Sequence, residues 1–508
     1  MESLFKSLED EIVSEKDISV PEFLKTWLSK PKLNFIGNQL CESNSKKVFC
    51  NTNPATEEDL NWVVLSDKVD VEKAITVARE AFNKGDWAKL TQSQRAQVVK
   101  KLGDLILQHR APLAILESLD TGKPIFETFE GDIPRAASNF HFFADFAKEE
   151  ETLQFQNGLD EHQAFREPLG VVALITPWNL PLYLETWKIA PALMMGNSIV
   201  LKPSELTPLT ACYFAELTLQ AGLPPGVFNV IHGFGDKAAG EFLVSDPRID
   251  AISFTGETST GRAIMRSAAV GPTRVSFELG GKGATVIFED ADIEMAATET
   301  LRAGFRNQGQ ICLATPRVFV HESVYSKFKE LFVEKAKQIK VGNPLNYSTR
   351  MGSLIGREHW EKVMSYVCRV EEPMKVLLGG DRPKEIKKGA FLGPTILENV
   401  PLDHKISREE IFGPVVSIYS FSDESAVVRE INSTQYGLSA SIWTRNTERA
   451  QRVARSIHVG LVWINCWFAR DLRVPFGGQK RSGVGREGGK HSLDFFSEWK
   501  SVCLRRTQ

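Results

Sequence analysis

The 508-residue sequence lacks the features that mark several classes of protein. Its apolar runs, such as LGVVALI at 169–175, are far shorter than the roughly 20 residues that cross a bilayer, so we expect no membrane protein. The formal net charge is only −3, which gives no basic field for binding nucleic acid. The seven cysteines form no CxxC pair and no repeated spacing, which argues against a disulfide framework and a zinc site. No metal is predicted.

Targeting signals are also absent from both ends of the sequence. The first 17 residues, MESLFKSLEDEIVSEKD, lack the apolar stretch of a secretory signal and are too acidic for a typical mitochondrial transit peptide. The last residues, CLRRTQ, are not a peroxisomal signal. Because the cysteine usage also favours a reducing compartment, we expect a cytoplasmic protein.

The composition is that of an ordinary globular protein, with 42% hydrophobic and 25% charged residues. A chain of 508 residues is too long for one compact core, so two or three domains are expected. The first 30 residues predict a helix and an arm leading into the first domain. Residues 71–151 have the apolar spacing of amphipathic surface helices.

Two later blocks alternate short β-rich runs with helical runs. In the first block, GVVALI precedes ETWKIAPALMMG, and SIVLK precedes TPLTACYFAELTLQAG. The second block begins with ATVIF at 284–288. This alternation predicts parallel sheets with helices on both faces. Two such blocks predict two α/β domains, with a ligand bound in the cleft between them.

Two glycine-containing turns lie between a predicted strand and a predicted helix. HGFGDKA at 232–238, with Gly233 and Gly235, fits the G-x-G-x-x-G/A pattern of dinucleotide sites. FTGETSTG at 254–261 places Gly256 and Gly261 where backbone N–H groups can meet a phosphate. Either turn alone is equally consistent with a plain βα connection. Both together, in successive units, favour a dinucleotide.

The segment LKPSEL at 201–206 follows the SIVLK strand and places Lys202 and Glu205 at the carboxyl edge of the sheet. A carboxylate at this edge accepts hydrogen bonds from ribose hydroxyls and repels a 2′-phosphate, which favours NAD over NADP. The same segment is also a helix N-terminal signal, with Ser204 or Thr207 as cap, and both interpretations can hold.

Three residues could carry out chemistry together. Cys312, in FRNQGQICLATPR, is a candidate nucleophile, although a cysteine in such a stretch is more often an inert buried thiol. Glu278 ends an apolar strand before Gly280 and Gly281, for which we expect an unusual backbone; it is a candidate base or a salt-bridging residue. Asn179, in ITPWNLPL, could donate to an oxyanion or form an Asx-turn.

The motifs PWNLPL, KPSELTP, FTGETSTG, FELGGK, GQIC and EEIFGPV occur in this order and resemble those of the aldehyde dehydrogenase superfamily. The resemblance extends from NPATEE at 53–58 to PFGGQKRSGVGREGG at 475–489. It implies an α/β fold with a Rossmann-type NAD domain (1–148 and 169–279), an α/β catalytic domain (280–478) and a small oligomerisation arm (149–168 and 479–508). A homodimer or homotetramer is expected.

The resemblance implies roles for individual residues. Cys312 would be the nucleophile and Glu278 the base, while Asn179 and the Cys312 backbone N–H would form the oxyanion hole. Lys202 and Glu205 would hold the adenosine ribose of NAD. The complete set of implied cofactor contacts is Thr176, Pro177, Trp178, Lys202, Glu205, Gly235, Phe254, Gly256, Glu410 and Phe412. Glu257 departs from the family pattern, which commonly has serine at this pyrophosphate contact.

Two further motifs resemble the branch of this family that oxidises 2-hydroxymuconate and 2-aminomuconate semialdehydes. These are DIPRAASNFHFFAD at 132–145 and VWINCWFARDLRVPFGG at 462–478. Arg135 and Arg470 match the arginines that hold the substrate carboxylate in that branch, and guanidinium groups suit this role. The alternatives are structural ion pairs with Asp132 and Asp471, or Arg473 in place of Arg470.

The expected activity is therefore NAD-dependent oxidation of a small-molecule aldehyde to an acid through a cysteine thioester. The resemblance implies a muconate-type semialdehyde from aromatic-compound or tryptophan catabolism. Alternatives are a broad-specificity or betaine-type aldehyde dehydrogenase, a CoA-acylating relative, or a non-catalytic scaffold protein on the same fold.

Overall fold

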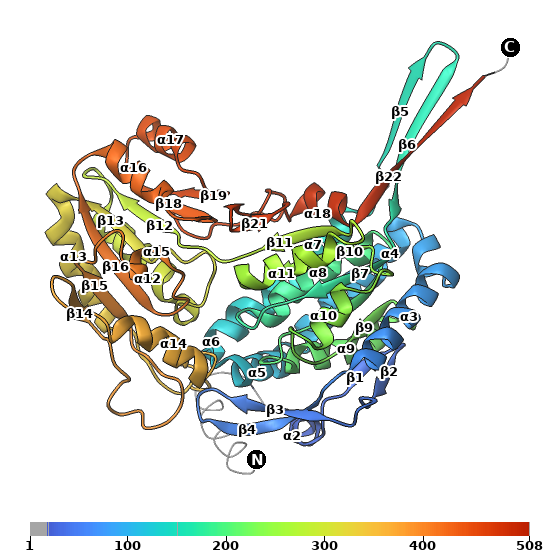
Figure 1. The fold of residues 1–508 in the computed structure, drawn as a ribbon, viewed down its shortest axis with the longest axis horizontal. Helices are drawn as coiled ribbons and strands as arrows, with labels where there is room; N and C mark the ends of the chain where they lie inside the picture. The colour runs from blue at the N-terminus through green and yellow to red at the C-terminus, as the bar shows by residue number, and fades with distance from the viewer. Residues whose placement is uncertain (1–17, 19, 150, 507–508) are drawn as a thin grey trace.

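The computed structural model describes residues 18, 20–149 and 151–506. Two α/β lobes lie side by side, and a slender β-arm projects from one of them (Figure 1). The predicted α/β class with parallel sheets is confirmed. The helix expected within the first 30 residues is α2 (Glu22–Ser29), whereas residues 1–17 of that prediction lie outside the described residues.

The first lobe surrounds a sheet whose central strands are parallel. Within the described residues, this eight-stranded sheet has the order β2 (Gln39–Cys41), β1 (Asn34–Ile36), β9 (Phe228–Val230), β8 (Ser198–Lys202), β7 (Val171–Ile175), β10 (Ala251–Thr255), β11 (Arg274–Glu278) and β21 (Gly483–Val484). Strands β9, β8, β7, β10 and β11 pair in parallel.

Helices cover both faces of this sheet, because its central strands β7, β8 and β10 are buried along their whole length. Every position of β7 and β8 is buried. Val172 and Leu174 pack in one core, and Val171 and Ala173 in another. The first core contains α4 (Gln92–Gln108), α5 (Arg110–Thr121), α7 (Ile133–Phe146), α8 (Pro181–Met194) and α9 (Leu209–Ala221), and the second contains α3 (Lys68–Lys84), α10 (Ala239–Val244) and α11 (Thr258–Ala268).

The order of the parallel strands reverses between β7 and β10. The chain runs outward from β7 through β8 to β9, and later returns to add β10 and β11 on the other side of β7. At such a switch point the connections leave in opposite directions and open a crevice at the carboxyl ends of the strands. Thr176 and Gly256 follow the two strands that border this crevice.

The second lobe contains a mainly parallel sheet of its own. Its strands lie in the order β14 (Lys375–Leu378), β15 (Thr395–Glu398), β16 (Val415–Phe421), β13 (Arg317–His321), β12 (Ala284–Ile287), β18 (Ser439–Trp443) and β19 (Leu461–Ile464). The helices that pack on it are α12 (Ile293–Phe305), α13 (Glu322–Lys337), α14 (Arg357–Val367), α16 (Glu424–Asn432) and α17 (Thr447–Ser456). A second crossover point lies between β12 and β18.

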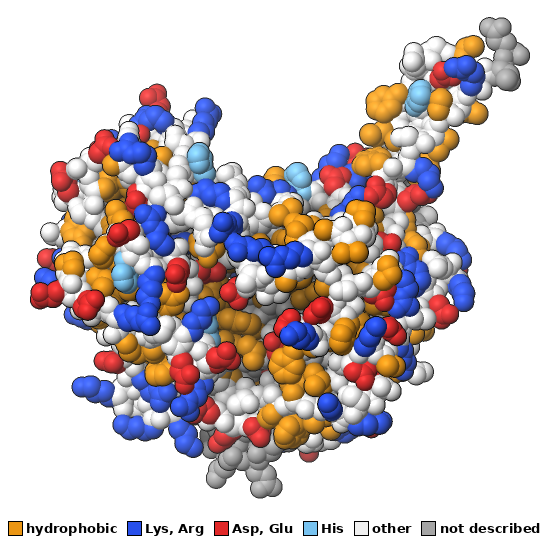
Figure 2. All heavy atoms as spheres, in the orientation of Figure 1, with side chains coloured by type: hydrophobic (Ala, Val, Ile, Leu, Met, Phe, Trp, Pro, Cys, Tyr) orange, Lys and Arg blue, Asp and Glu red, His pale blue; other side chains and the backbone are white. Residues whose placement is uncertain are grey.

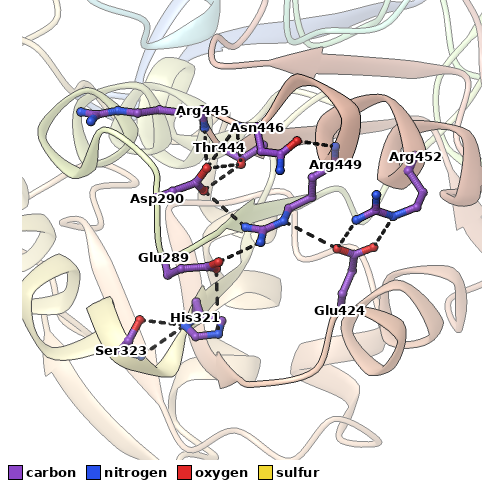
Figure 3. Close-up of polar contacts among 10 residues, drawn as sticks. All are labelled: Glu289, Asp290, His321, Ser323, Glu424, Thr444, Arg445, Asn446, Arg449 and Arg452. Carbon is purple, nitrogen blue, oxygen red and sulfur yellow. Dashed lines mark hydrogen bonds and ion pairs between the residues drawn. The ribbon is translucent and has the colours of Figure 1, made fainter.

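A polar network closes the carboxyl edge at that second crossover point (Figure 3). Asp290 accepts hydrogen bonds from the Thr444 hydroxyl at 2.7 Å and from the Arg445 and Asn446 backbone N–H groups at 3.1 Å. Arg449 adds an ion pair to Asp290 at 3.4 Å and another to Glu289 at 2.8 Å. Charged groups that satisfy one another in this way fix the edge of the sheet rather than leave room for a ligand.

The arm is a three-stranded antiparallel sheet made of β5 (Thr152–Asn157), β6 (Asp160–Pro168) and β22 (Ser497–Arg505). Hydrophobic side chains gather on its surface (Figure 2), among them Phe155, Val502 and Leu504. None of the helices in the described part of the chain combines the length and apolarity needed to cross a bilayer.

Smaller elements join these parts. They are β3 (Val48–Asn53) with β4 (Glu58–Val64), β17 (Tyr436–Gly437) with β20 (Gln479–Lys480), the helices α6 (Ile125–Glu127), α15 (Lys405–Arg408) and α18 (Gly489–Phe495), the 3-10 turns Trp87–Lys89 and Arg306–Gly309, and the π-helix Thr128–Asp132.

Candidate active site

The loop that carries Cys312 has a strained backbone. After α12 ends, Asn307, Gln308 and Gly309 adopt φ angles of 48°, 55° and 70°. Left-handed conformations of this kind are costly for the two residues with side chains, and they persist only when the surroundings hold them. A Cβ at Gly309 would lie 2.2 Å from the Gly413 carbonyl oxygen, so only glycine fits there.

Side-chain amides hold this loop against the segment that follows β7. Asn307 Nδ2 donates to the Asn179 carbonyl oxygen at 2.8 Å, and Asn179 Nδ2 donates to the Gln310 carbonyl oxygen at 2.8 Å. Gln308 Nε2 donates to the Ser353 carbonyl oxygen at 2.9 Å. Asn179 therefore lies against the cysteine loop, 131 residues away in sequence, and its second Nδ2 hydrogen has no partner among the described residues.

Glu278 ends β11 in a buried position, and neither of its carboxylate oxygens has a hydrogen-bond partner within the described chain. Burial raises its pKa well above the usual value for a glutamate, and the charge of Glu487 raises it further. A buried carboxyl with a raised pKa and no fixed partner is available to exchange a proton.

Gly280 and Gly281 do not have the unusual backbone that we expected from the sequence, since neither has a positive φ. Close packing is the reason for these glycines instead. A Cβ at Gly281 would lie 2.5 Å from the Cys312 carbonyl oxygen, and one at Gly280 would lie 2.0 Å from a Glu410 carboxylate oxygen. The turn after Glu278 is thereby packed directly on the cysteine loop.

The thiol of Cys312 is half-buried and protonated at rest. Burial raises its pKa to about 12, with further contributions from the carboxylates of Glu278 and Glu410. The backbone N–H groups of Cys312 and Leu313 act in the opposite direction, since they stabilise negative charge at the sulfur. A base must therefore remove the thiol proton before this cysteine can act as a nucleophile.

A buried ion pair that the sequence analysis did not identify lies behind Glu278. Lys188 of α8 pairs with Glu487 at 2.5 Å and donates to the Ser253 hydroxyl at 2.9 Å. Glu487 raises the pKa of Glu278, and Lys188 lowers it. No local signal marks Lys188 or Glu487, because they are 299 residues apart and meet only in the fold.

Aromatic side chains border the crevice at the nucleotide side. The Trp178 ring meets the rings of Phe412 and His359 edge to face, both at 5.2 Å between centroids. His359 Nε2 lies 2.7 Å from the Phe412 carbonyl oxygen, and Phe412 has a left-handed backbone with φ 58°. The next residues along the crevice, Pro177 and Glu410, are partly buried, and Glu410 accepts a hydrogen bond from the Gly281 N–H at 2.7 Å. Burial raises the pKa of Glu410 to about 7.

The other implied nucleotide contacts lie along the carboxyl edge of the first sheet. Lys202 Nζ lies 3.4 Å from Glu205 Oε2, and burial lowers the pKa of this lysine. The Thr176 hydroxyl is buried near the Glu185 carboxyl and meets no hydrogen-bond criterion with any of the described residues. The ring of buried Phe254 turns back over Gly256, where a Cβ would meet it at 2.4 Å. Thr176, Lys202 and Gly256 thus share one edge.

Gly235 and Glu257 are less closely tied to the crevice. Gly235 is exposed between β9 and α10, two strands away from β7, and a Cβ there would meet no atom within 4 Å. The structural context predicted for HGFGDKA, after a strand and before a helix, is present. Glu257, which departs from the family pattern, is exposed at the N-cap of α11.

Arg470 lies against aromatic rings with part of its guanidinium unsatisfied. It donates from Nη1 to the Tyr183 hydroxyl and stacks on Trp187 at 4.1 Å and Phe476 at 4.6 Å. Its Nη2 is buried and has no hydrogen-bond partner among the described residues. Arg473 is instead exposed and paired with Asp471 at 2.6 Å, so Asp471 is not the partner of Arg470.

Arg135 of α7 stacks on Phe468 at 4.8 Å. Its neighbour Asp132 pairs with the buried Lys123 at 2.6 Å, so the structural ion pair considered for Arg135 is not formed. Arg135 and Arg470 are electrostatic neighbours of each other and of Tyr183. They line separate hollows, of about 720 Å³ and about 440 Å³, that adjoin Phe468.

A cysteine, a buried carboxyl group and an amide are brought together by this fold, and comparisons with known proteins show the family of the chain. A model of the aldehyde dehydrogenase family matches residues 40–502. The chain belongs to the aldehyde dehydrogenase family. The resemblance found in the sequence is thereby confirmed.

The most similar relatives include two named for muconate-type substrates. The chain is 43% identical to 2-hydroxymuconic semialdehyde dehydrogenase of Pseudomonas sp. (strain CF600), with 93% of this chain and 99% of that protein covered. It is 43% identical to 2-aminomuconic semialdehyde dehydrogenase of Bos taurus, covering 93% and 98%. A solved NAD+ complex of aldehyde dehydrogenase from Bacillus cereus superposes with a TM-score of 0.94 at 38% identity, covering 97% of this chain and 100% of that one.

Most of the residues predicted for this aldehyde dehydrogenase site form two groups, one along the carboxyl edge of the first sheet and one around the cysteine loop. Asn179, Glu278, Cys312 and Glu410 surround the cysteine loop. The sequence analysis missed Asn307, Gln308, His359, Lys188 and Glu487, which support those residues. Among these, only Asn307 and Gln308 could have been noticed from sequence, since they adjoin Gly309 in the cysteine motif.

Proposed function

We propose that this protein is an NAD-dependent aldehyde dehydrogenase that oxidises a carboxylated aldehyde, 2-hydroxymuconate or 2-aminomuconate semialdehyde, to the corresponding acid. One observation carries the proposal. Asn179 is hydrogen-bonded to the Cys312 loop, Glu278 acts electrostatically on Cys312, and Arg470, whose charge acts on Glu278, has a guanidinium nitrogen with no partner among the described residues. The names of the relatives support the substrate class.

The crevice has groups that suit NAD. The Glu205 carboxylate suits the adenosine ribose hydroxyls and would repel a 2′-phosphate. The Thr176 hydroxyl and the backbone at Gly256, where a Cβ would not fit, leave polar groups and space at the sheet edge. We assign Trp178, Phe412 and Glu410 to the nicotinamide side of the site. NAD supplies one function there, which is to accept the hydride that leaves the aldehyde carbon.

The chain's own residues would act in sequence. Cys312 loses its thiol proton and adds to the aldehyde carbon, and the free Nδ2 hydrogen of Asn179 and the Cys312 N–H stabilise the resulting oxyanion. Once the carbon is oxidised, Cys312 holds a thioester. Glu278 then takes a proton from water, which attacks the thioester and releases the acid. A base whose pKa is raised above that of an ordinary glutamate suits this step.

A betaine-type substrate is disfavoured by charge. Such an aldehyde carries a quaternary ammonium group, which the guanidinium groups of Arg135 and Arg470 would repel. A CoA-acylating reaction is disfavoured because Glu278 lies beside the thioester position, where it would promote hydrolysis.

We further propose the domain roles implied by the family. Residues 1–148 and 169–279 would bind NAD, 280–478 would carry the cysteine, and 149–168 with 479–508 would mediate assembly into a homodimer or homotetramer. The exposed hydrophobic side chains of the arm support assembly. The seven unpaired cysteines support a cytoplasmic location.

The decisive experiment measures NADH formation with 2-hydroxymuconate semialdehyde and with hexanal as a neutral aldehyde of similar length. We expect a higher kcat/KM for the semialdehyde, and no NADH from Cys312→Ser with either aldehyde. Cys368→Ser, at an exposed position away from the crevice, is the matched control and should retain full activity. Near-normal turnover in Cys312→Ser would contradict the assignment of the nucleophile.

A further inference from the structure

The larger of the two hollows beside Phe468 contains a third arginine that the proposed function leaves without a role. This cavity of about 720 Å³ lies between the π-helix Thr128–Asp132 and α7 on one side and the end of α12 on the other. Both Arg135 and Arg306 line it. Arg306 is the residue directly before the left-handed segment that leads to Cys312.

Phe468 links this cavity to the reacting cysteine. Arg135 stacks on its ring at 4.8 Å, and Arg306 lies 5.9 Å from the same ring. Phe468 also belongs to the apolar cluster that packs around Cys312, and it lines the second hollow together with Arg470. Two guanidinium groups therefore lie against one aromatic ring next to Cys312, and a third lines the adjoining hollow.

Ion pairing around these guanidinium groups is sparse. Within the described chain, Arg306 has one ion pair, a long one of 3.9 Å to Glu127, and Arg135 and Arg470 have none. Burial lowers the pKa of Arg135, and the next largest cause is the positive charge of Arg306. The charge of Asp132 acts in the opposite direction, although its ion pair is with Lys123. A partly buried group of cations with a single ion-pair partner favours an anionic ligand.

The glycine at position 131 leaves space for the guanidinium of Arg306. A Cβ at Gly131 would lie 3.2 Å from Arg306 Nη2, so a side chain at this position would crowd the guanidinium. Gly131 lies in the π-helix Thr128–Asp132, a form that is rare and occurs frequently at functional sites. Glu127, just before this π-helix, faces both Arg306 and the Asn307 backbone.

We propose that Arg306 is a further specificity-determining residue, which with Arg135 forms a second anion subsite, so that a second carboxylate on the aldehyde, beyond the one that the muconate semialdehydes carry, strengthens binding. This inference rests on the proposed function, since it places the second subsite beside the carboxylate site of Arg470. One substrate carboxylate would pair with Arg470, and a second with Arg135 and Arg306.

The test uses three planar aldehydes that differ only in the number of carboxylates: benzaldehyde, 3-formylbenzoate and 5-formylbenzene-1,3-dicarboxylate. NADH formation gives kcat/KM for the wild type, Arg306→Gln, Arg306→Lys and the control Arg473→Gln. The wild type should favour the dicarboxylate over 3-formylbenzoate. Arg306→Gln should lose about tenfold or more on the dicarboxylate, the cost of one charge-assisted partner, and little on the other two. Arg306→Lys should recover part of the loss, and Arg473→Gln should match the wild type.

Two results would overturn the proposal. One is a wild type that does not distinguish one carboxylate from two; the other is an equal loss on all three aldehydes in Arg306→Gln, which would make Arg306 a support of the cysteine loop. If the aromatic aldehydes are not oxidised, benzoate and isophthalate are tested as competitive inhibitors of wild type and Arg306→Gln. An inhibition constant for isophthalate that is the same in both proteins would overturn the proposal. Failure of 3-formylbenzoate to outperform benzaldehyde contradicts the proposed carboxylated substrate instead.

Discussion

Burial raises the pKa of both Glu278 and Cys312, and a raised pKa makes each group a poorer anion and a better proton acceptor once deprotonated. Glu278 can accept a proton only above its own pKa, which lies well above that of an ordinary glutamate. Hydrolysis of the thioester should therefore slow as the pH falls through that raised value. The charge of Glu487 contributes to the shift, and Lys188 opposes it.

Glu278→Gln separates the two halves of the reaction. The amide cannot accept a proton from water, so the thioester should accumulate after the first turnover. Stopped-flow absorbance should show a burst of NADH close to one equivalent per site, followed by turnover slower by about 10²-fold or more. Loss of the burst in a folded variant would instead assign Glu278 to deprotonation of Cys312.

Arg470 and Arg473 provide a matched pair, because they lie three residues apart and only Arg470 has an unsatisfied buried nitrogen. Arg470→Gln should raise KM for 2-hydroxymuconate semialdehyde by about 10- to 150-fold, which corresponds to about 1.5–3 kcal/mol for a charge-assisted hydrogen bond. KM for hexanal should scarcely change in the same variant. Arg473→Gln should leave both values unchanged. Equal losses on both aldehydes would give Arg470 a structural role.

The carboxyl edge of the second sheet depends on Asp290, which links the end of β12 to the start of α17 (Figure 3). Burial raises its pKa, but hydrogen bonds from Thr444 and nearby N–H groups and the charge of Arg449 outweigh this, so the pKa is lowered overall. A lowered pKa in the folded state means that Asp290 contributes stability above the unfolded value of 3.8, and that this contribution is lost as the pH falls further.

Asp290→Asn should therefore lower the free energy of unfolding by about 1–3 kcal/mol at neutral pH. The midpoint of denaturation in urea measures the change, and the difference from wild type should shrink below about pH 4. Arg452→Gln is the control, since its pair with Glu424 lies on an exposed side chain and should be worth less than about 1 kcal/mol. Equal midpoints for Asp290→Asn and wild type at neutral pH would contradict the role of this network.

At the scale of the whole molecule, the most prominent feature is the β-arm, which projects away from the two lobes (Figure 1). Phe155 and Leu504 are 62% and 58% exposed, and they belong to strands that no core covers. Water contact with side chains of this size is unfavourable by about 1.5–3 kcal/mol each relative to burial. A second copy of the chain that covered the arm would recover this free energy.

Phe155→Asp combined with Leu504→Asp should shift the protein toward smaller species in size-exclusion chromatography with light scattering. The circular dichroism spectrum should stay unchanged, because these residues pack in neither lobe. Gln154→Asp with Gln156→Asp places two charges at exposed positions of the same strand and is the control. An unchanged mass in the Phe155 and Leu504 variant would show that the arm does not hold the assembly together.

The sequence by itself determined the parts of this protein that depend on local pattern. Unbroken apolar runs such as VVALI and SIVLK have to be covered on both faces, so parallel sheets followed directly. Ordered motifs determined the family, and they predict the nucleophile, the base and the amide, because their residue types match one known chemistry. The glycines of FELGGK were expected to need an unusual backbone, and close packing against Cys312 and Glu410 turned out to be the cause.

Only the tertiary structure decided which distant side chains support that chemistry. The Lys188–Glu487 pair, the amide contacts of Asn307 with Asn179, and the place of Arg306 beside Phe468 join segments more than 100 residues apart in sequence. No local periodicity reports such contacts, since they depend on how segments that are distant in sequence pack together. The left-handed backbone of Asn307 and Gln308 is likewise unfavourable locally and is held by the surrounding fold.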